Sequence, residues 1–418
     1  MNFPDMALIK QSFDPSCISN IPAAIISEME RIGIPDKVKN GETVAITAGS
    51  RGIANIDIIT RAVVHFLARI KAKPFIFPAM GSHGGATASG QKNLLARYGI
   101  TEEAMGCPII SNMDVDEIGK TPDNIPVFID RSAHSADHII IINRIKPHTK
   151  FEGSIESGLM KMMVIGMGKN LGAKWYHKAS VRLGMSRLIE TIGYEVIENI
   201  PVLCGIGLVE NGYDNTAIIK AVLPTDLAEE EKKLLIEAKH RLSRLPFSNI
   251  DLLIIDEMGK NISGTGMDTN VTGVNRDILG TFSYGPCTRR LFVRELTKES
   301  EGNATGIGLA DFTTTRLVKK IDRKKTYINC LTGISPEKGA IPMYFDKDRE
   351  CIEAAIHTLG MVSIEELLIV HIQNTLSLEK LNVSRAFMPE IQNKKSIEII
   401  GRWQPLQFDN NGNLTSPF

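Results

Sequence analysis

The stretch TVAITAGSRGIANIDIITRAVVHFLARIKAKPFIFPAMGSHGG, residues 43–85, decides the fold class. It starts with an apolar run, Thr43 to Gly49, and continues with apolar residues at helical spacing over residues 56–72. A second apolar run, from Phe75 to Gly85, then leaves into a glycine-rich turn. An apolar strand, an amphipathic helix and another apolar strand in this order predict a βαβ unit, and hence a parallel sheet.

The same alternation continues along the chain. Residues 138–145, HIIIINRI, and residues 202–211, VLCGIGLVEN, have the composition of further buried strands. Residues 228–246 show a charged helical pattern with Glu–Lys pairs four residues apart and a proline at the end. Such a solvated helix is typical of a boundary between two domains.

A second series of strands and helices begins at DLLIIDEMGKNISGTG, residues 251–266. We therefore predict an α/β protein with two α/β domains, mainly parallel sheets and an active-site cleft between the domains. The first domain is predicted over residues 1–246 and the second over residues 247–418. The β-like stretch SIEIIGRWQPLQFD, residues 396–409, could return to either domain, so the end of the chain could pack back on the first one.

Composition excludes several classes of function. The 418 residues carry a formal net charge of zero, which argues against nucleic acid or an anionic membrane as a partner. No apolar run is long enough to span a bilayer, and the first residues lack the pattern of a signal peptide. The six cysteines form no CxxC pair, so we expect reduced thiols and a cytoplasmic protein.

Unusual polar residues follow the predicted strands, where α/β proteins collect their ligands. Ser50 and Arg51 stand in GSRG after the first strand, where backbone N–H groups and a guanidinium suit a phosphate or carboxylate. His83 stands in AMGSHGG after the second strand, and its imidazole could act as base, acid or metal ligand. A plain turn with a surface arginine and a capping histidine is the alternative.

His148 follows the third strand in NRIKPHT, next to Lys146 and Arg144, whose charges suit an anionic ligand. Histidines at two strand ends would suit racemisation, which needs an acid or base on each face of the substrate. They would also suit metal binding, and the residues alone do not decide between the two.

Four further positions carry chemically useful groups. Lys161 lies among Leu, Met, Val and Ile, so desolvation would lower its pKa and make it nucleophilic, unless it reaches solvent along an apolar segment. His177 ends LGAKWYH, where it could equally be a structural histidine in an aromatic cluster. Glu257 and Lys260 follow a strand of the second domain and could face a ligand or form an exposed ion pair.

As a set, these residues resemble the nickel-dependent lactate racemase family, whose members use a nickel pincer nucleotide. The resemblance covers most of the chain. The interval of 65 residues between the two strand-end histidines and that of 16 residues from Lys161 to His177 are close to the family's layout. The resemblance rests on seven positions in the same order: Arg51, His83, His148, Lys161, His177, Glu257 and Lys260.

The resemblance implies a racemase or epimerase of a 2-hydroxy acid that works by proton-coupled hydride transfer to the cofactor. Lys161 matches the lysine that holds the cofactor through a thioamide, and His177 matches the protein ligand of nickel. His83 and His148 match the two catalytic histidines. Ser50 and Arg51 would bind the cofactor phosphate or the substrate carboxylate, and Glu257 and Lys260 would reach the substrate from the second domain.

The same resemblance implies partner proteins that build the cofactor, so protein made without them would lack it. A homo-oligomer is compatible with the sequence. Ala48 and Gly52 depart from the family's aspartate and proline, Glu257 replaces its glutamine, and the interval from His148 to Lys161 is about three residues longer. These departures leave the identity of the 2-hydroxy acid open.

Two other functions remain compatible with the residues. His83, His148 and His177 could bind zinc and activate water, as in a hydrolase or lyase. Alternatively, the chain could be a non-catalytic protein that binds an anionic metabolite.

Overall fold

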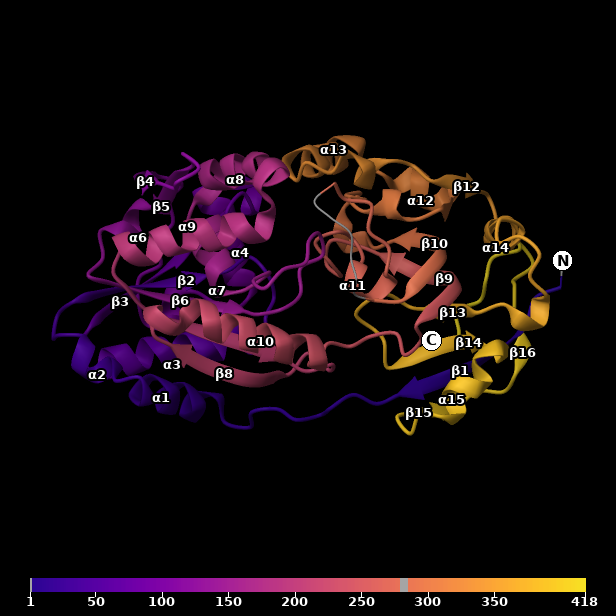
Figure 1. Ribbon diagram of the computed structural model, residues 1–418, viewed down its shortest axis with the longest axis horizontal. Coiled ribbons are helices and arrows are strands. Elements are labelled where there is room, and N and C mark those ends of the chain that lie inside the picture. The colour runs from indigo at the N-terminus through magenta and orange to yellow at the C-terminus, as the bar shows by residue number, and fades with distance from the viewer. Residues whose placement is uncertain (1, 279–284) are drawn as a thin grey trace. The chain divides into compact units, whose positions relative to one another are not determined.

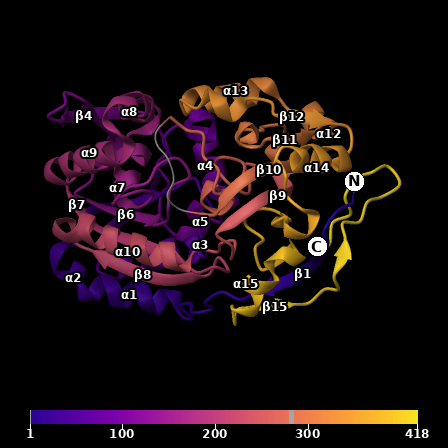
Figure 2. The same ribbon diagram turned by 45° about the vertical axis from the view of Figure 1, so that its right-hand side comes forward.

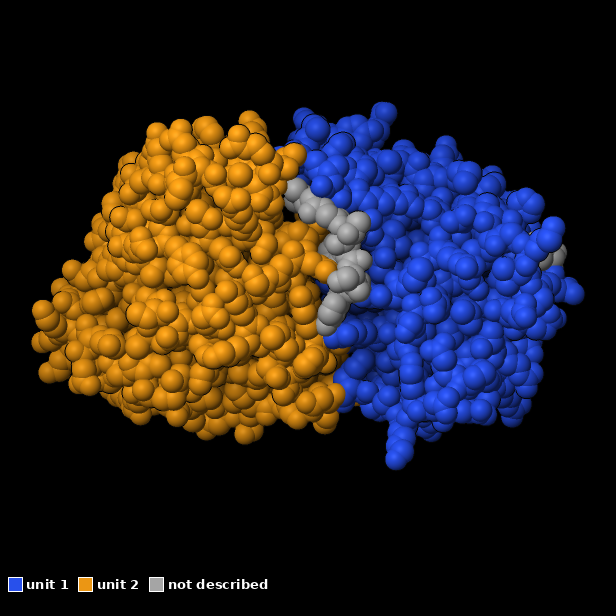
Figure 3. Space-filling view, in the orientation of Figure 1, with its two compact units in different colours: residues 1–13, 243–418 blue, residues 14–242 orange. Residues whose placement is uncertain are grey.

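The computed structural model describes residues 2–278 and 285–418 (Figure 1). The chain forms two compact units, coloured separately in Figure 3. Unit 2 comprises residues 14–242, and unit 1 comprises residues 1–13 together with residues 243–418. The expected active-site cleft between the domains stays a prediction.

Unit 2 is built on a five-stranded sheet in the order β3–β2–β6–β7–β8. The first four strands in this order are parallel, and β8 is antiparallel to β7. A separate antiparallel pair is formed by β4 and β5. The bounds are β2 (Thr43–Ala48), β3 (Lys73–Pro78), β4 (Val115–Lys120), β5 (Pro126–Asp130), β6 (His138–Arg144), β7 (Val202–Glu210) and β8 (Thr216–Val222).

Both faces of this sheet are covered, which explains why its strands are apolar runs and do not alternate with polar residues. Val44 and Ile46 of β2 pack into a core with α1 and α3, which lie side by side (Figures 1 and 2). Ala45 points to the other face, into a core with α9 and α10. The helices are α1 (Ile21–Arg31), α2 (Ile34–Lys37), α3 (Ile56–Arg69), α4 (Ala88–Arg97), α5 (Glu102–Met105), α6 (Arg131–His134), α7 (Leu159–Lys161), α8 (Lys169–Leu183), α9 (Met185–Asn199) and α10 (Leu227–Arg241).

The strand order creates a point where the chain changes direction across the sheet. From β2 the chain crosses to β3 on one side, and from β3 it returns to β6 on the other side of β2. The carboxyl ends of β2 and β6 are therefore neighbours whose connections diverge. In open α/β sheets this is where ligands bind.

Unit 1 has a larger mixed sheet in the order β12–β11–β10–β9–β13–β14–β1–β15, with β16 also paired to β1. The strands from β12 to β13 are parallel, and the remaining pairs are antiparallel. The strands are β9 (Asn249–Met258), β10 (Cys287–Leu296), β11 (Phe312–Thr314), β12 (Met343–Phe345), β13 (Ile369–Ile372), β14 (Lys380–Ser384), β1 (Asp5–Gln11), β15 (Ile397–Ile399) and β16 (Gln404–Pro405). The helices are α11 (Thr269–Thr272), α12 (Thr315–Lys320), α13 (Arg323–Thr332), α14 (Asp348–His357) and α15 (Met388–Gln392).

The α/β class and the mostly parallel sheets agree with the sequence prediction, but the N-terminal residues fall in the other unit than predicted. The first 13 residues belong to unit 1, because β1 pairs with β14 and buries Met6, Ala7 and Ile9. The C-terminal strands β15 and β16 also pair with β1, so this stretch returns to its own unit. Among the helices that the structure describes, none combines the length and the apolar surface needed to cross a bilayer.

Candidate active site at the carboxyl edge of the unit 2 sheet

The loops after β2 and β3 meet through side chains. Ser50 follows β2, and its Oγ forms a hydrogen bond with Nδ1 of His83, which follows β3. The hydroxyl of Tyr98 donates to the carbonyl of Ser50 at 3.0 Å. Gln91 of α4 donates to the carbonyl of His83 at 3.2 Å. These contacts hold the exposed His83 ring beside the GSRG loop, at one end of the sheet.

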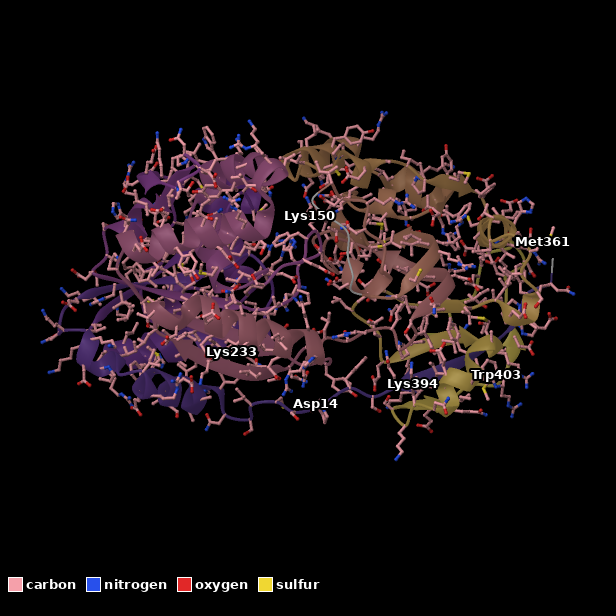
Figure 4. The ribbon with its side chains drawn as sticks, viewed as in Figure 1. Asp14, Lys150, Lys233, Met361, Lys394 and Trp403 are labelled. Carbon is pink, nitrogen blue, oxygen red and sulfur yellow. The ribbon has the colours of Figure 1, made fainter. Side chains whose placement is uncertain are left out.

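His148 is fixed in the loop after β6. Its backbone N–H donates to Oε2 of Glu156 at 2.6 Å, and its ring stacks on Phe151 with a centroid separation of 4.3 Å. Its Nδ1 accepts the backbone N–H of Lys150 at 3.1 Å (Lys150 is labelled in Figure 4). A neutral ring with Nδ1 as acceptor carries its proton on Nε2, so His148 presents a hydrogen-bond donor there.

Lys161 lies where a short helix changes into a π-helical turn. α7 ends at Lys161, and Met162–Gly166 form the π-helical turn, a rare feature that is frequent at functional sites. The chain reaches α7 from β6 along an antiparallel bridge between Lys146 and Ser157. Asn143 of β6 also donates to the carbonyl of Gly158 at 2.7 Å, which ties α7 to the end of β6.

Glycines bring the π-helical turn against the ends of β2 and β3. The N–H of Gly81 donates to the carbonyl of Gly166 at 3.2 Å. A Cβ on Gly166 would lie 2.7 Å from the carbonyl oxygen of Ala79, so a side chain at that position would push the segments apart. A Cβ on Gly49 would lie 3.0 Å from Cε of Met162. Lys161 is thereby held near the same sheet edge as Ser50 and His83.

Burial lowers the pKa of Lys161 from 10.5 to about 7. Desolvation is the largest cause, followed by the positive charges of Arg51, Lys146 and Lys150, while Glu156 acts in the opposite direction. The amine is therefore partly neutral, and hence nucleophilic, at neutral pH. The apolar neighbours in the sequence predict this desolvation, and the surrounding cations make the position suitable for an anionic ligand.

His177 lies on α8 with a half-buried side chain. The neighbouring Tyr176 is fully buried, and its hydroxyl accepts the N–H of Phe128 at 2.8 Å. In the described part of the chain, no group of three or more His, Cys, Asp or Glu side chains could hold a metal ion. His83, His148 and His177 therefore do not form a zinc site in this structure, and the role of His177 as a single nickel ligand stays a prediction.

Glu257 and Lys260 lie in unit 1, at and just after the end of β9. Asn374 donates to Oε1 of Glu257 at 3.0 Å, and Nζ of Lys260 donates to the carbonyl of Gly264 at 2.7 Å. Their contribution to substrate binding stays a prediction.

Two buried glutamates near the site were missed from the sequence. Glu156 lies in a Gly/Ser loop and Glu231 in the charged helix α10, and both are 1% exposed. The helical spacing of Glu231 with the apolar Leu227, Leu234 and Leu235 could have placed it on the buried face of α10. No pattern in the sequence around Glu156 indicates that this residue is buried.

Residues 11–186 match the family model described as the lactate racemase N-terminal domain. This part of the chain is therefore similar to the N-terminal domain of lactate racemases. The match includes every candidate residue of unit 2, from Ser50 to His177. Among curated proteins, none matches the sequence of this chain.

The fold agrees with that of a solved lactate racemase family structure. The lactate racemase apoprotein from Thermoanaerobacterium thermosaccharolyticum superposes with a TM-score of 0.51 and 13% sequence identity, over 87% of this chain and 93% of that chain. At this identity the likeness shows a shared fold, which includes both units of the chain.

Proposed function

We propose that this chain racemises or epimerises a 2-hydroxy acid and holds a nickel pincer nucleotide on Lys161. The observation that carries the proposal is the position of Lys161. Its amine has a pKa of about 7 and is surrounded by Arg51, Lys146 and Lys150, at the sheet edge where His83 also lies.

The residues of unit 2 fit such a cofactor. A neutral amine can form an amide-type bond to an activated acid, and three neighbouring cations suit the phosphate and acid groups of a nucleotide. His177 would supply one imidazole nitrogen to nickel, which is compatible with the lack of a larger metal-binding cluster among the described residues. When bound, the cofactor supplies an acceptor for the α-hydrogen of the substrate.

His83 and His148 differ in which ring nitrogen can donate and which can accept a hydrogen bond. If Nδ1–H of His83 donates to Ser50, its Nε2 is left with a lone pair that can take the hydroxyl proton of a 2-hydroxy acid. His148 donates from Nε2 to a substrate oxygen. To act as the base for the opposite enantiomer, His148 must release the N–H of Lys150 and carry its proton on Nδ1.

Loss of optical purity tests the proposal. The protein is produced together with the cofactor-building enzymes and incubated with a panel of enantiopure 2-hydroxy acids, and chirality is followed over time. We expect at least one acid to lose optical purity, and His83→Ala and His148→Ala each to slow this loss about 100-fold or more. An unchanged optical purity for every acid, with cofactor present on the protein, contradicts the proposal.

A further inference from the structure

Helix α10 makes contacts with two of the segments that carry the predicted chemistry of unit 2, the turn of Lys161 and the loop of His148. Glu231 of α10 is 1% exposed, and its Oε2 accepts the backbone N–H of Met160 at 2.8 Å. Met160 is the residue before Lys161. The N–H of Leu159 also faces this carboxylate. A charged side chain of one helix thus holds the turn on which Lys161 stands.

The fit between Glu231 and this turn requires a glycine. A Cβ on Gly158 would lie 2.1 Å from Oε1 of Glu231, much closer than two such atoms can approach. Burial raises the pKa of Glu231 to about 7, and the N–H groups of Met160 and Leu159 partly oppose this shift. Burying a carboxylate in so unfavourable an environment costs free energy, which the hydrogen bonds from these N–H groups offset in part.

Eight residues further along α10, Lys239 reaches the loop of His148. Its Nζ lies 2.5 Å from Oε1 of Glu156, whose side chain is fully buried. The other oxygen of Glu156 accepts the backbone N–H of His148 at 2.6 Å. α10 therefore holds His148 through Glu156, just as it holds Lys161 through Glu231.

We infer that α10 sets the position of His148 relative to Lys161, with Glu231 and Lys239 as positioning residues for the two segments. The inference rests on the proposed function for what Lys161 and His148 do there. The arrangement itself depends only on contacts within unit 2.

Hydrogen exchange of the full chain without cofactor tests the arrangement directly. Glu231→Gln keeps the shape of the side chain but replaces one acceptor oxygen with a donor. We expect the amides of residues 159–161 to exchange about tenfold faster or more, because they lose a hydrogen bond to a charged group. Lys239→Met should have the same effect on residues 148–153 and leave residues 159–161 unchanged.

Glu229→Gln is the matched control. Glu229 lies on the same helix but is exposed and pairs with Lys232 at 2.8 Å. The substitution Glu229→Gln should change hydrogen exchange in neither segment. If Glu231→Gln does not fold, Gly158→Ala tests the same contact from the other side, since it displaces the carboxylate without removing it. Exchange that is unchanged, or equally faster throughout unit 2, would overturn the inference.

The loaded enzyme gives a second readout that a general loss of stability would not produce. Lys239→Met should keep the cofactor on Lys161 but lower kcat about tenfold with little change in KM. Glu231→Gln should lower the fraction of chains that carry the cofactor. If the wild type racemises no acid but exchange responds as expected, the proposed function fails and the positioning role stands. Racemisation by the wild type with exchange that does not respond in the variants would support the proposed function and overturn the positioning role.

Discussion

At the scale of single residues, Lys161 combines burial with three neighbouring cations, and its pKa falls to about 7. Its amine is therefore mostly neutral above pH 7, whereas an ordinary lysine is neutral only above about pH 10.4.

In protein without cofactor, we expect an amine-acylating reagent to modify Lys161 with a rate that rises to a plateau just above pH 7. Lys233, on α10 (labelled in Figure 4), pairs with Glu230 and serves as a control whose rate rises through pH 9. Peptide mapping across pH measures both, and parallel profiles for the two lysines would refute the low pKa.

The same shift predicts how stability depends on pH. Between about pH 7 and pH 10.5 the unfolded chain binds a proton at Lys161 that the folded chain does not, so this residue destabilises the fold increasingly as pH falls through that window. Lys161→Met should therefore raise Tm at pH 7, by about 2–4 °C for each kcal/mol gained in a unit of this size. The gain should shrink as pH approaches 10. Thermal unfolding at several pH values checks this, and a gain that grows with pH would contradict it.

The sequence could identify Lys161 as a candidate, but it did not identify the buried glutamates near it, Glu156 and Glu231. A lysine within an apolar segment is visible in the sequence, but the sequence leaves open whether its amine is desolvated or reaches solvent. Glu156 stands in a Gly/Ser loop, and its burial depends on tertiary packing that no local pattern reveals. The helical spacing of Glu231 with apolar residues marks the buried face of α10, but it does not reveal the contact of this carboxylate with Met160.

At the scale of elements, the strands that precede Ser50, His83 and His148 could be predicted from apolar runs and the residues that follow them. The predicted strands agree closely with β2, β3, β6 and β7. The π-helical turn could not be predicted, because it results from packing of Gly166 against Ala79 at the end of β3. The high glycine content of this segment was the only local sign.

This packing predicts a strong effect of one methyl group. In Gly166→Ala the new Cβ would meet the carbonyl oxygen of Ala79, so we expect a loss of about 1–3 kcal/mol in unfolding free energy. Urea denaturation measures the loss. Gly52→Ala is the control, because its Cβ would make only an ordinary contact of 3.7 Å with the ring of Tyr98. Equal stability of the two variants would show that the turn is not held in this way.

At the scale of the whole molecule, the N-terminal strand β1 belongs to unit 1 and not to unit 2, which follows it in the chain. Sequence could not reveal this, because β1 pairs with β14 across most of the chain length and no local pattern encodes the partner. The boundary predicted near residue 246 is close to the observed one at residue 243, since the end of a solvated helix is a local signal.

Because β1 belongs to unit 1, a destabilising substitution in β1 should lower the stability of unit 1 and leave unit 2 unchanged. Ile9 is fully buried in the core of unit 1, so Ile9→Ala should cost about 2–5 kcal/mol there. Hydrogen exchange should become faster in β13 and β14 and stay unchanged in β2 and β6. Lys10→Ala changes an exposed neighbour and should affect neither unit. Faster exchange in β2 and β6 would mean that β1 supports unit 2 instead.

We propose that Lys161 carries a covalently bound nickel pincer nucleotide, and mass spectrometry of protein produced with the cofactor-building enzymes can detect it. We predict an added mass on the intact chain, located on the peptide of Lys161, together with bound nickel and lost in Lys161→Ala. An unmodified Lys161 without nickel under these conditions would contradict the account.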